Sequence, residues 1–218
     1  MVKVAVILSG CGYLDGSEIH ESVLSFLALE QAGYSYECFA PDEKQSDVIN
    51  HLNEKEDASH SRNILEESAR IARGRVQALS LLSAQKFDAL LMPGGFGAAK
   101  NLSDFYAKGT DCSVNGDLSR IVREFYEQKK PIGATCITPA PLAKIFSSIN
   151  ASVTMTLGKS EEFNAKLKEM GAKAVSADVT EMVADETNRV YTTPCYMEPD
   201  NLLGMFEGIK KLVAKLSH

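Results

Sequence analysis

Residues 130–142 read Lys-Pro-Ile-Gly-Ala-Thr-Cys-Ile-Thr-Pro-Ala-Pro-Leu and combine a short strand with the start of a helix. The strand is expected over residues 132–135, and the helix is expected to begin near Pro139 or Ala140. Cys136 stands at the junction, the position of a nucleophile elbow in an α/β protein. Because a helix N-terminus favours a thiolate, the pattern predicts a reactive Cys136 with a lowered pKa. The alternative from these residues alone is a small, buried core side chain.

The rest of the chain alternates buried strands and amphipathic helices in the same way. Short apolar runs predict strands over residues 3–8, 34–39 and 87–92. Apolar residues at helical spacing predict helices over residues 17–32, 58–74, 118–128 and 202–216. Residues 181–184 and 189–193 flank a four-residue turn and predict a β-hairpin. This order predicts an α/β fold with a mostly parallel sheet, crossover helices and a small antiparallel hairpin.

The composition is that of one globular domain spanning residues 1–218. Hydrophobic residues make up 44% of the chain and charged residues 24%, which is sufficient to form a core. The net charge of −6 provides no cationic excess for a phosphate backbone, so nucleic acid is not expected as a partner. No apolar run approaches the roughly 18 residues of a spanning helix, so no membrane association is expected. The apolar run at residues 4–8 ends in a glycine-rich turn and predicts a first strand, not a signal peptide.

Five cysteines are spread widely along the chain, and their spacing matches no zinc motif. This pattern predicts free thiols in a reducing cytoplasm and no bound metal. We expect Cys38 to pack in a strand, Cys112 to lie in an exposed loop, and Cys195 to border the same crevice as Cys136. For Cys11, in the first loop, a redox role beside Cys136 and a purely structural role both remain open.

Three loops that follow strands carry the candidate site residues. The carboxyl ends of neighbouring parallel strands meet at one edge of a sheet, where such folds bind ligands. Glu18, Gly95 and Cys136 are therefore expected to meet there. Glycine allows close approach of the backbone, so the amides around Gly94 and Gly95 are expected to join that of Ile137 in binding an oxyanion or substrate.

Each of these assignments has a simpler alternative. The glycine pair can serve only as a tight turn, and Glu18 can be a first-turn acid that complements the helix dipole, with Asp15 or Ser17 as N-cap. His20 is two positions from Glu18 on the predicted helix, so the two side chains are expected to diverge. Surface or capping roles are expected for His51, His60, Lys100 and Asn101.

Seven segments together carry a family resemblance: SGCGYLDGSEIHE, CFAPD, VINHL, ARIARG, PGGFGAAKNLSDF, KKPIGATCITPA and TTPCYM. In this order the chain resembles the ElbB-type glyoxalases, in the PfpI-like branch of the class I glutamine amidotransferase-like superfamily. The resemblance implies a flavodoxin-like three-layer sandwich, a homodimer, an elbow cysteine at Cys136 and a nearby glutamate at Glu18. It also departs from the wider superfamily, because Ile137 follows the cysteine where active amidotransferases and peptidase-like members often place a histidine. Proteolysis and glutamine hydrolysis are therefore disfavoured.

The activity that the resemblance implies is a lyase reaction of the glyoxalase type, without a cofactor. Cys136 would add to glyoxal or a similar small aldehyde to give a hemithioacetal, and Glu18 would move protons until glycolate is released. A protonated Glu18 could donate to the thiolate, so we expect a raised Glu18 pKa, a lowered Cys136 pKa and coupled titration. The alternatives are a thiol-based redox or electrophile sensor, an auxiliary protein of isoprenoid metabolism, and an amidotransferase-like hydrolase.

Overall fold

The computed structural model describes residues 1–198 and 201–217 and is built around a seven-stranded sheet. The strand order is β10-β11-β7-β6-β1-β2-β5, and every neighbouring pair is parallel except β10 and β11. The strands are β1 (Lys3–Ile7), β2 (Ser35–Ala40), β5 (Val76–Ala78), β6 (Ala89–Met92), β7 (Ile132–Thr135), β10 (Val183–Asp185) and β11 (Val190–Thr193). The predicted α/β fold with a mostly parallel sheet is confirmed.

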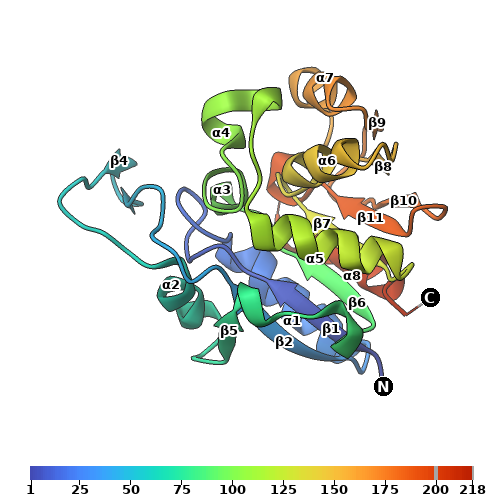
Figure 1. The fold of residues 1–218 in the computed structure, drawn as a ribbon, viewed down its shortest axis with the longest axis horizontal. Coiled ribbons are helices and arrows are strands. Elements are labelled where there is room, and N and C mark those ends of the chain that lie inside the picture. Colours follow the sequence, from blue (N-terminus) through green and yellow to red (C-terminus); the bar gives the residue numbers. More distant parts are fainter. Residues whose placement is uncertain (199–200, 218) are drawn as a thin grey trace.

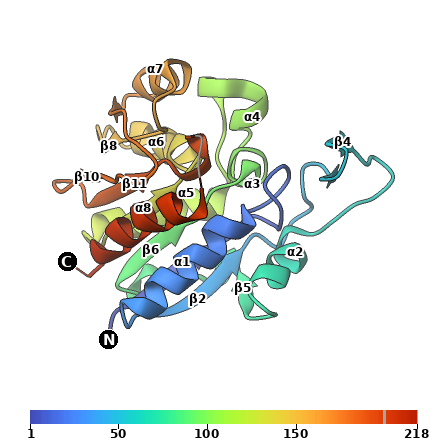
Figure 2. The same ribbon diagram turned by 180° about the vertical axis from the view of Figure 1, so that it is seen from behind.

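Helices cover both faces of this sheet and complete a three-layer sandwich (Figures 1 and 2). One face carries α1 (Ile19–Gln31) and α8 (Leu202–Ala214), which pack against each other, and the other carries α5 (Gly116–Glu127) and α6 (Pro139–Ser148). The shorter helices are α2 (Ile64–Ile71), α3 (Phe96–Lys100), α4 (Phe105–Lys108) and α7 (Glu161–Glu169). Two-residue strands form the pairs β3 (Ile49–Asn50) with β4 (Lys55–Glu56) and β8 (Thr154–Met155) with β9 (Lys173–Ala174).

The central strands are buried on both faces, which explains their composition. Residues 4–7 of β1 and all of β6 are wholly inaccessible to solvent and are aliphatic, apart from Met92. Parallel strands between two helical layers need apolar side chains on both faces, so they show no alternation of polar and apolar residues. β1, β6 and β7 are also parallel neighbours in the sheet. Their carboxyl ends therefore lie side by side, and the loops that follow them meet at one edge.

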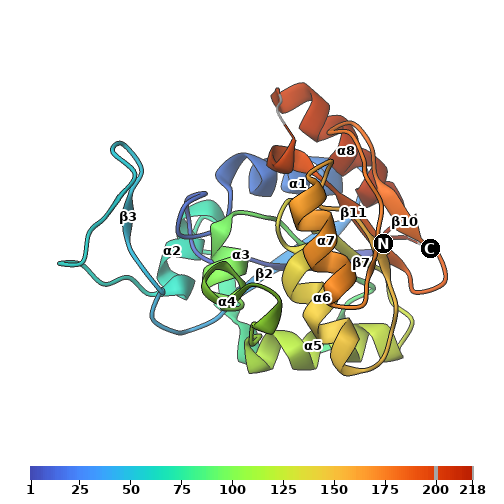
Figure 3. The same ribbon diagram turned by 90° about the horizontal axis from the view of Figure 1, so that it is seen from above.

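The predicted hairpin is present as β10 and β11, with Val183 opposite Thr192. The predicted helix over residues 58–74 is too long, because only Ile64–Ile71 are helical. Residues 41–63 instead contain the short strands β3 and β4, and part of this segment reaches away from the body (Figure 3). Its polar residues between positions 50 and 61 offer little apolar surface to bury, so no core helix forms there. Within the described residues, no helix is long and apolar enough to cross a bilayer.

Candidate active site

Cys136 occupies a sharp turn between β7 and α6. Its φ is +57°, a left-handed conformation that non-glycine residues seldom adopt. The turn is held because the Cys136 amide donates to the Thr193 carbonyl at 3.0 Å, and the Thr138 hydroxyl donates to the Pro93 carbonyl at 3.0 Å. Proline at the first position of α6 fits a helix start, since its missing N–H is not needed there. The predicted elbow is therefore present, and it directs the thiol toward the edge of the sheet.

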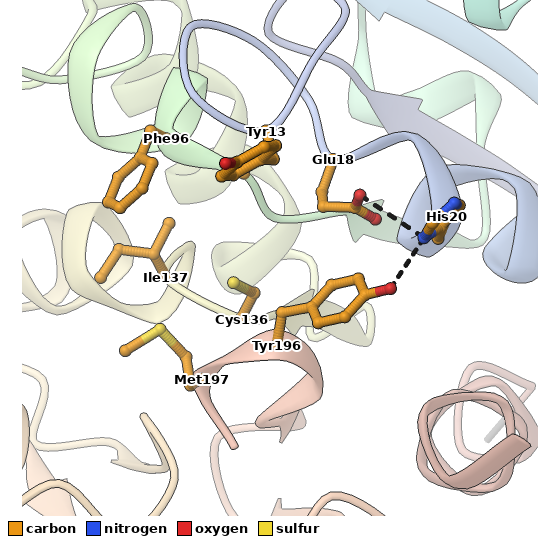
Figure 4. A pocket seen from close by; sticks show the side chains of 9 residues that line it. Tyr13, Glu18, His20, Phe96, Cys136, Ile137, Tyr196 and Met197 are labelled. Carbon is orange, nitrogen blue, oxygen red and sulfur yellow. Dashed lines mark hydrogen bonds and ion pairs between the residues drawn. The ribbon is translucent and has the colours of Figure 1, made fainter. Parts of the chain in front are cut away.

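A cavity of about 460 Å³ opens above this thiol (Figure 4). Four of the five predicted site residues line it: Glu18, Gly95, Cys136 and Ile137. The remaining lining residues are Tyr13, His20, Phe96, Tyr196 and Met197. The cavity thus draws on the loops after β1, β6, β7 and β11, as the edge of a parallel sheet allows.

Gly94, the fifth predicted residue, does not line the cavity but lies against Cys136 and Glu21. Its N–H donates to Glu21 Oε2 at 3.0 Å and to Thr135 Oγ1 at 2.9 Å. A Cβ at position 94 would lie 2.3 Å from the Cys136 Cβ and 2.7 Å from Glu21 Oε2. Glycine is required here because two other groups occupy the space of a side chain.

Glu21 is the carboxylate that contacts the cysteine, and sequence reasoning did not identify it. Its side chain is completely buried, and Oε2 also accepts a 2.6 Å hydrogen bond from the Thr135 hydroxyl. Burial raises the pKa of this carboxyl to about 7; the nearby Glu18 also raises it, while Thr135, Gly94 and the Cys136 thiol lower it through hydrogen bonds. Glu21 Oε1 has no hydrogen-bond partner among residues 1–198 and 201–217. A carboxyl with these properties is suited to accept a proton near neutral pH.

The prediction of a lowered thiol pKa is wrong for the resting site. Burial, followed by the charge of Glu21, raises the pKa of Cys136 well above its usual value, and hydrogen bonds from the Gly95 and Ile137 amides lower it in part. A raised carboxyl pKa is found at Glu21, the acid in contact with the thiol. The pair therefore rests as a thiol beside Glu21, and two backbone amides already point at the sulfur.

Glu18 forms the N-cap of α1 and also faces the cavity. Its Oε2 accepts from the Glu21 amide at 2.7 Å, so neither Asp15 nor Ser17 is the cap. Because an N-cap residue is extended and not helical, Glu18 and His20 do not diverge as predicted. His20 Nδ1 lies 3.9 Å from Glu18 Oε1 and shares a 2.7 Å hydrogen bond with the Tyr196 hydroxyl (Figure 4).

The loop after β1, which contributes Tyr13 to the cavity, is held in place by hydrogen bonds from Lys100 and Asn101. Asn101 Nδ2 donates to the carbonyls of Ser9 and Asp15, each at 2.8 Å. Lys100 Nζ donates to the Leu14 carbonyl at 2.9 Å. The expectation of a surface role is therefore wrong for Asn101, which is buried because it bonds the backbone of this loop.

The other cysteines lie outside the cavity wall. Cys38 packs in β2 as predicted, whereas Cys112 is buried and not exposed, since residues 109–115 fold back onto Ser103. Cys195 is wholly buried behind the cavity, and the residues after it line the wall in its place. Cys11 is half-buried and lies near Glu67 and not in the cavity. Among the described residues, no group of three metal-ligating side chains is found. The absence of a bound metal stays a prediction.

Comparison with known proteins gives a consistent picture. Residues 3–195 match the DJ-1/PfpI family. The chain is 42% identical to the rat (Rattus norvegicus) "ES1 protein homolog, mitochondrial" and 41% identical to the human "Glutamine amidotransferase-like class 1 domain-containing protein 3, mitochondrial", in each case over 98% of this chain and 82% of the relative. It superposes with a TM-score of 0.93 and 38% identity on an Ehrlichia chaffeensis "isoprenoid biosynthesis protein with amidotransferase-like domain", covering 100% of this chain and 98% of that one.

Proposed function

The chain belongs to the DJ-1/PfpI family, and from that premise we propose that it is a cofactor-independent enzyme of the glyoxalase type. Its substrates are small 2-oxoaldehydes such as glyoxal, and its products are 2-hydroxy acids such as glycolate. One observation carries the proposal: Cys136 stands at a cavity with the Gly95 and Ile137 amides at its sulfur and Glu21 beside it.

The first step is addition of sulfur to the aldehyde carbon. As the S–C bond forms, the thiol proton passes to Glu21, whose pKa of about 7 suits a base at neutral pH. The aldehyde oxygen becomes an oxyanion, which the Gly95 and Ile137 amides stabilise. Protonation of that oxygen by Glu21 gives a neutral hemithioacetal and restores the carboxylate.

The second step is an internal transfer of hydrogen. Glu18, which faces the cavity, removes the proton from the former aldehyde carbon and returns it to the neighbouring carbonyl carbon, through an enediol, while the hydroxyl proton passes from the first oxygen to the second. The result is a thioester of the hydroxy acid. Water then cleaves the thioester, giving the hydroxy acid and the free Cys136 thiol. The sequence is an isomerisation followed by hydrolysis, so no external oxidant or reductant is consumed.

The arrangement of His20 supports this activity over an amidotransferase-like hydrolase. Of the described side chains that line the cavity, His20 is the one imidazole, and it is bonded to Tyr196 and close to Glu18. The residue after the nucleophile is Ile137, which supplies an amide but no base. The two mammalian relatives are named as mitochondrial, so a cytoplasmic location stays a prediction for this chain. Its assembly as a homodimer is a prediction too.

The test is direct observation of turnover. Glyoxal and protein are mixed, and glycolate is followed by NMR for wild type, Cys136→Ala and Cys11→Ala; the last removes a cysteine outside the cavity. We expect catalytic turnover by wild type and Cys11→Ala and only the background rate with Cys136→Ala. Wild type no faster than Cys136→Ala would refute the proposal. One equivalent of stable adduct on Cys136 without turnover would instead support an electrophile sensor.

A further inference from the structure

The cavity is much larger than the smallest substrate. Glyoxal contains four non-hydrogen atoms, whereas about 460 Å³ lies within the range that binds drug-sized molecules. Glyoxal bound at Cys136 would leave most of this volume filled with water. The remaining volume can therefore hold a substituent on the substrate, and the lining residues indicate whether this substituent is polar or apolar.

The walls on either side of Cys136 differ in polarity (Figure 4). Phe96, Ile137 and Met197 gather on one side of the thiol, while Glu18, His20 and Tyr196 gather on the other. The reacting carbonyls need hydrogen bonds and proton transfer, so they belong toward Glu18 and the Gly95 amide. The rest of the molecule then points toward Phe96 and Met197.

The apolar wall is held in place by contacts within the protein. The Phe96 ring packs edge-on against Tyr106, with centroids 5.5 Å apart and planes at 78°. The Phe96 amide donates to the Tyr13 carbonyl at 2.7 Å, and Ile137 is 3% exposed. A ligand can therefore bury apolar surface here without first ordering the wall.

The charges around the cavity exclude an acidic substituent. No Lys or Arg is found among the described side chains that line it, and Glu18 contributes an acid. Lys100 Nζ lies 6.0 Å from the centre of the Phe96 ring, but it is paired with Asp47 at 2.7 Å and with the Leu14 carbonyl. A phosphate or carboxylate placed against Phe96 and Met197 would therefore be buried without a Lys or Arg partner.

From these features we infer that the preferred substrates are 2-oxoaldehydes that carry an uncharged apolar substituent, such as a branched alkyl chain or an aromatic ring, on the keto carbon. This inference rests on the proposed function. Cys136 adds to the aldehyde carbon, hydrogen moves from that carbon to the substituted carbon, and hydrolysis releases the substituted 2-hydroxy acid. The substituent lies against Phe96 and Met197 throughout.

The experiment compares glyoxal, methylglyoxal and 4-methyl-2-oxopentanal by kcat/KM, with formation of each hydroxy acid followed by NMR. We expect wild type to prefer the branched substrate, which has three more carbons, over methylglyoxal by at least about tenfold, since even one added carbon in an apolar pocket contributes roughly that factor. Phe96→Ala and Met197→Ala should each lower this preference several-fold. Leu81→Ala, which truncates an exposed leucine away from the cavity, should leave the preference unchanged. Circular dichroism establishes that each variant folds.

The outcomes separate this inference from the proposed function. If no 2-oxoaldehyde is converted faster by wild type than by Cys136→Ala, the glyoxalase proposal fails. If all three aldehydes are converted with similar kcat/KM, the function stands and the apolar preference is wrong. The preference is also wrong if Phe96→Ala and Met197→Ala lower all three rates by the same factor, because the loss would then have nothing to do with the substituent.

Discussion

The ends of β7 and β11 lie side by side, and each is followed by a sharp turn that contains a cysteine. Only one of these cysteines lines the cavity. Thr135 and Thr193 are paired in register, and the cysteine beyond each strand has a left-handed backbone, with φ of +57° at Cys136 and +46° at Cys195. Cys136 lines the cavity, whereas Cys195 is wholly buried. A sharp turn after a strand is therefore not sufficient to place a thiol at the cavity.

The difference arises from the helical segment that comes after each turn. Cys136 precedes the ten-residue helix α6, which leaves the Ile137 amide available to the sulfur. Cys195 instead begins the single 3₁₀ turn Cys195–Met197, which turns its thiol inward and places Tyr196 and Met197 in the wall. Burial raises the pKa of the Cys195 thiol well above its usual value, and no substrate reaches it without opening of the structure.

The sharpest test of this contrast is alkylation of the native protein. Iodoacetamide should modify Cys136 faster than Cys195 by on the order of 1000-fold, since exposing Cys195 requires a local opening of about 4 kcal/mol. Peptide mass spectrometry at timed intervals gives both rates, and the same reaction in urea gives the intrinsic rate of each thiol as control. Comparable native rates would contradict the contrast.

A second test concerns Glu21, the buried carboxyl beside Cys136. Its pKa is raised from 4.5 to about 7, so the folded protein holds a proton that the unfolded chain releases between these values. Stability is therefore lost as pH rises through this window, by about 3 kcal/mol. Urea unfolding at pH 5 and pH 8 should show this loss in wild type, and the loss should be absent from Glu21→Gln. Equal pH dependence in both proteins would show that Glu21 does not titrate in this window.

Close packing around Cys136 gives a third, smaller effect. Gly94→Ala places a Cβ 2.3 Å from the Cys136 Cβ and should destabilise the protein by about 2 kcal/mol. Gly116→Ala, at a position with open space, is the matched control and should be neutral or slightly stabilising. Thermal unfolding of both variants measures the difference. Similar melting temperatures would mean that the site yields to a side chain at position 94.

The smallest expected effect is at the second turn itself. Cys195→Ala removes one buried sulfur and should cost about 1 kcal/mol of stability, as a small cavity does. Turnover of 2-oxoaldehydes should persist, because Cys195 has no chemical part in the proposed reaction. Chemical denaturation together with the NMR assay tests both statements, and loss of turnover in a folded variant would give Cys195 a chemical role after all.

Much of the fold can be predicted from local patterns in the sequence. The aliphatic runs at β1 and β6, the hairpin of β10 and β11, and the junction at Cys136 each depend on neighbouring residues. The segment 41–63 escapes such patterns because its conformation depends on a lack of apolar surface over many residues. The three-residue strand β5 is too short to show a period and exists through pairing with β2.

The site is only partly visible in the sequence because its contacts are tertiary. Glu18 stands out by its place after a glycine-rich loop, and it does face the cavity. Glu21 is identified only when Glu18 is recognised as the N-cap, since the first turn then points Glu21 inward toward Gly94 and Thr135. Phe96, Tyr196 and Met197 lie in or beside the glycine and cysteine motifs, but nothing local distinguishes a lining side chain from a core one.

The hydrogen bonds among Glu21, Gly94 and Thr135 also bear on when the site forms as the chain folds. They join positions 73, 41 and 114 residues apart, so each depends on closing a long loop. The Glu21 carboxyl reaches Cys136 only after α1, β6 and β7 have docked together. A ribosome-bound or partly unfolded chain therefore carries an ordinary thiol at this position, and the pairing of Cys136 with Glu21 appears only when the sheet is assembled.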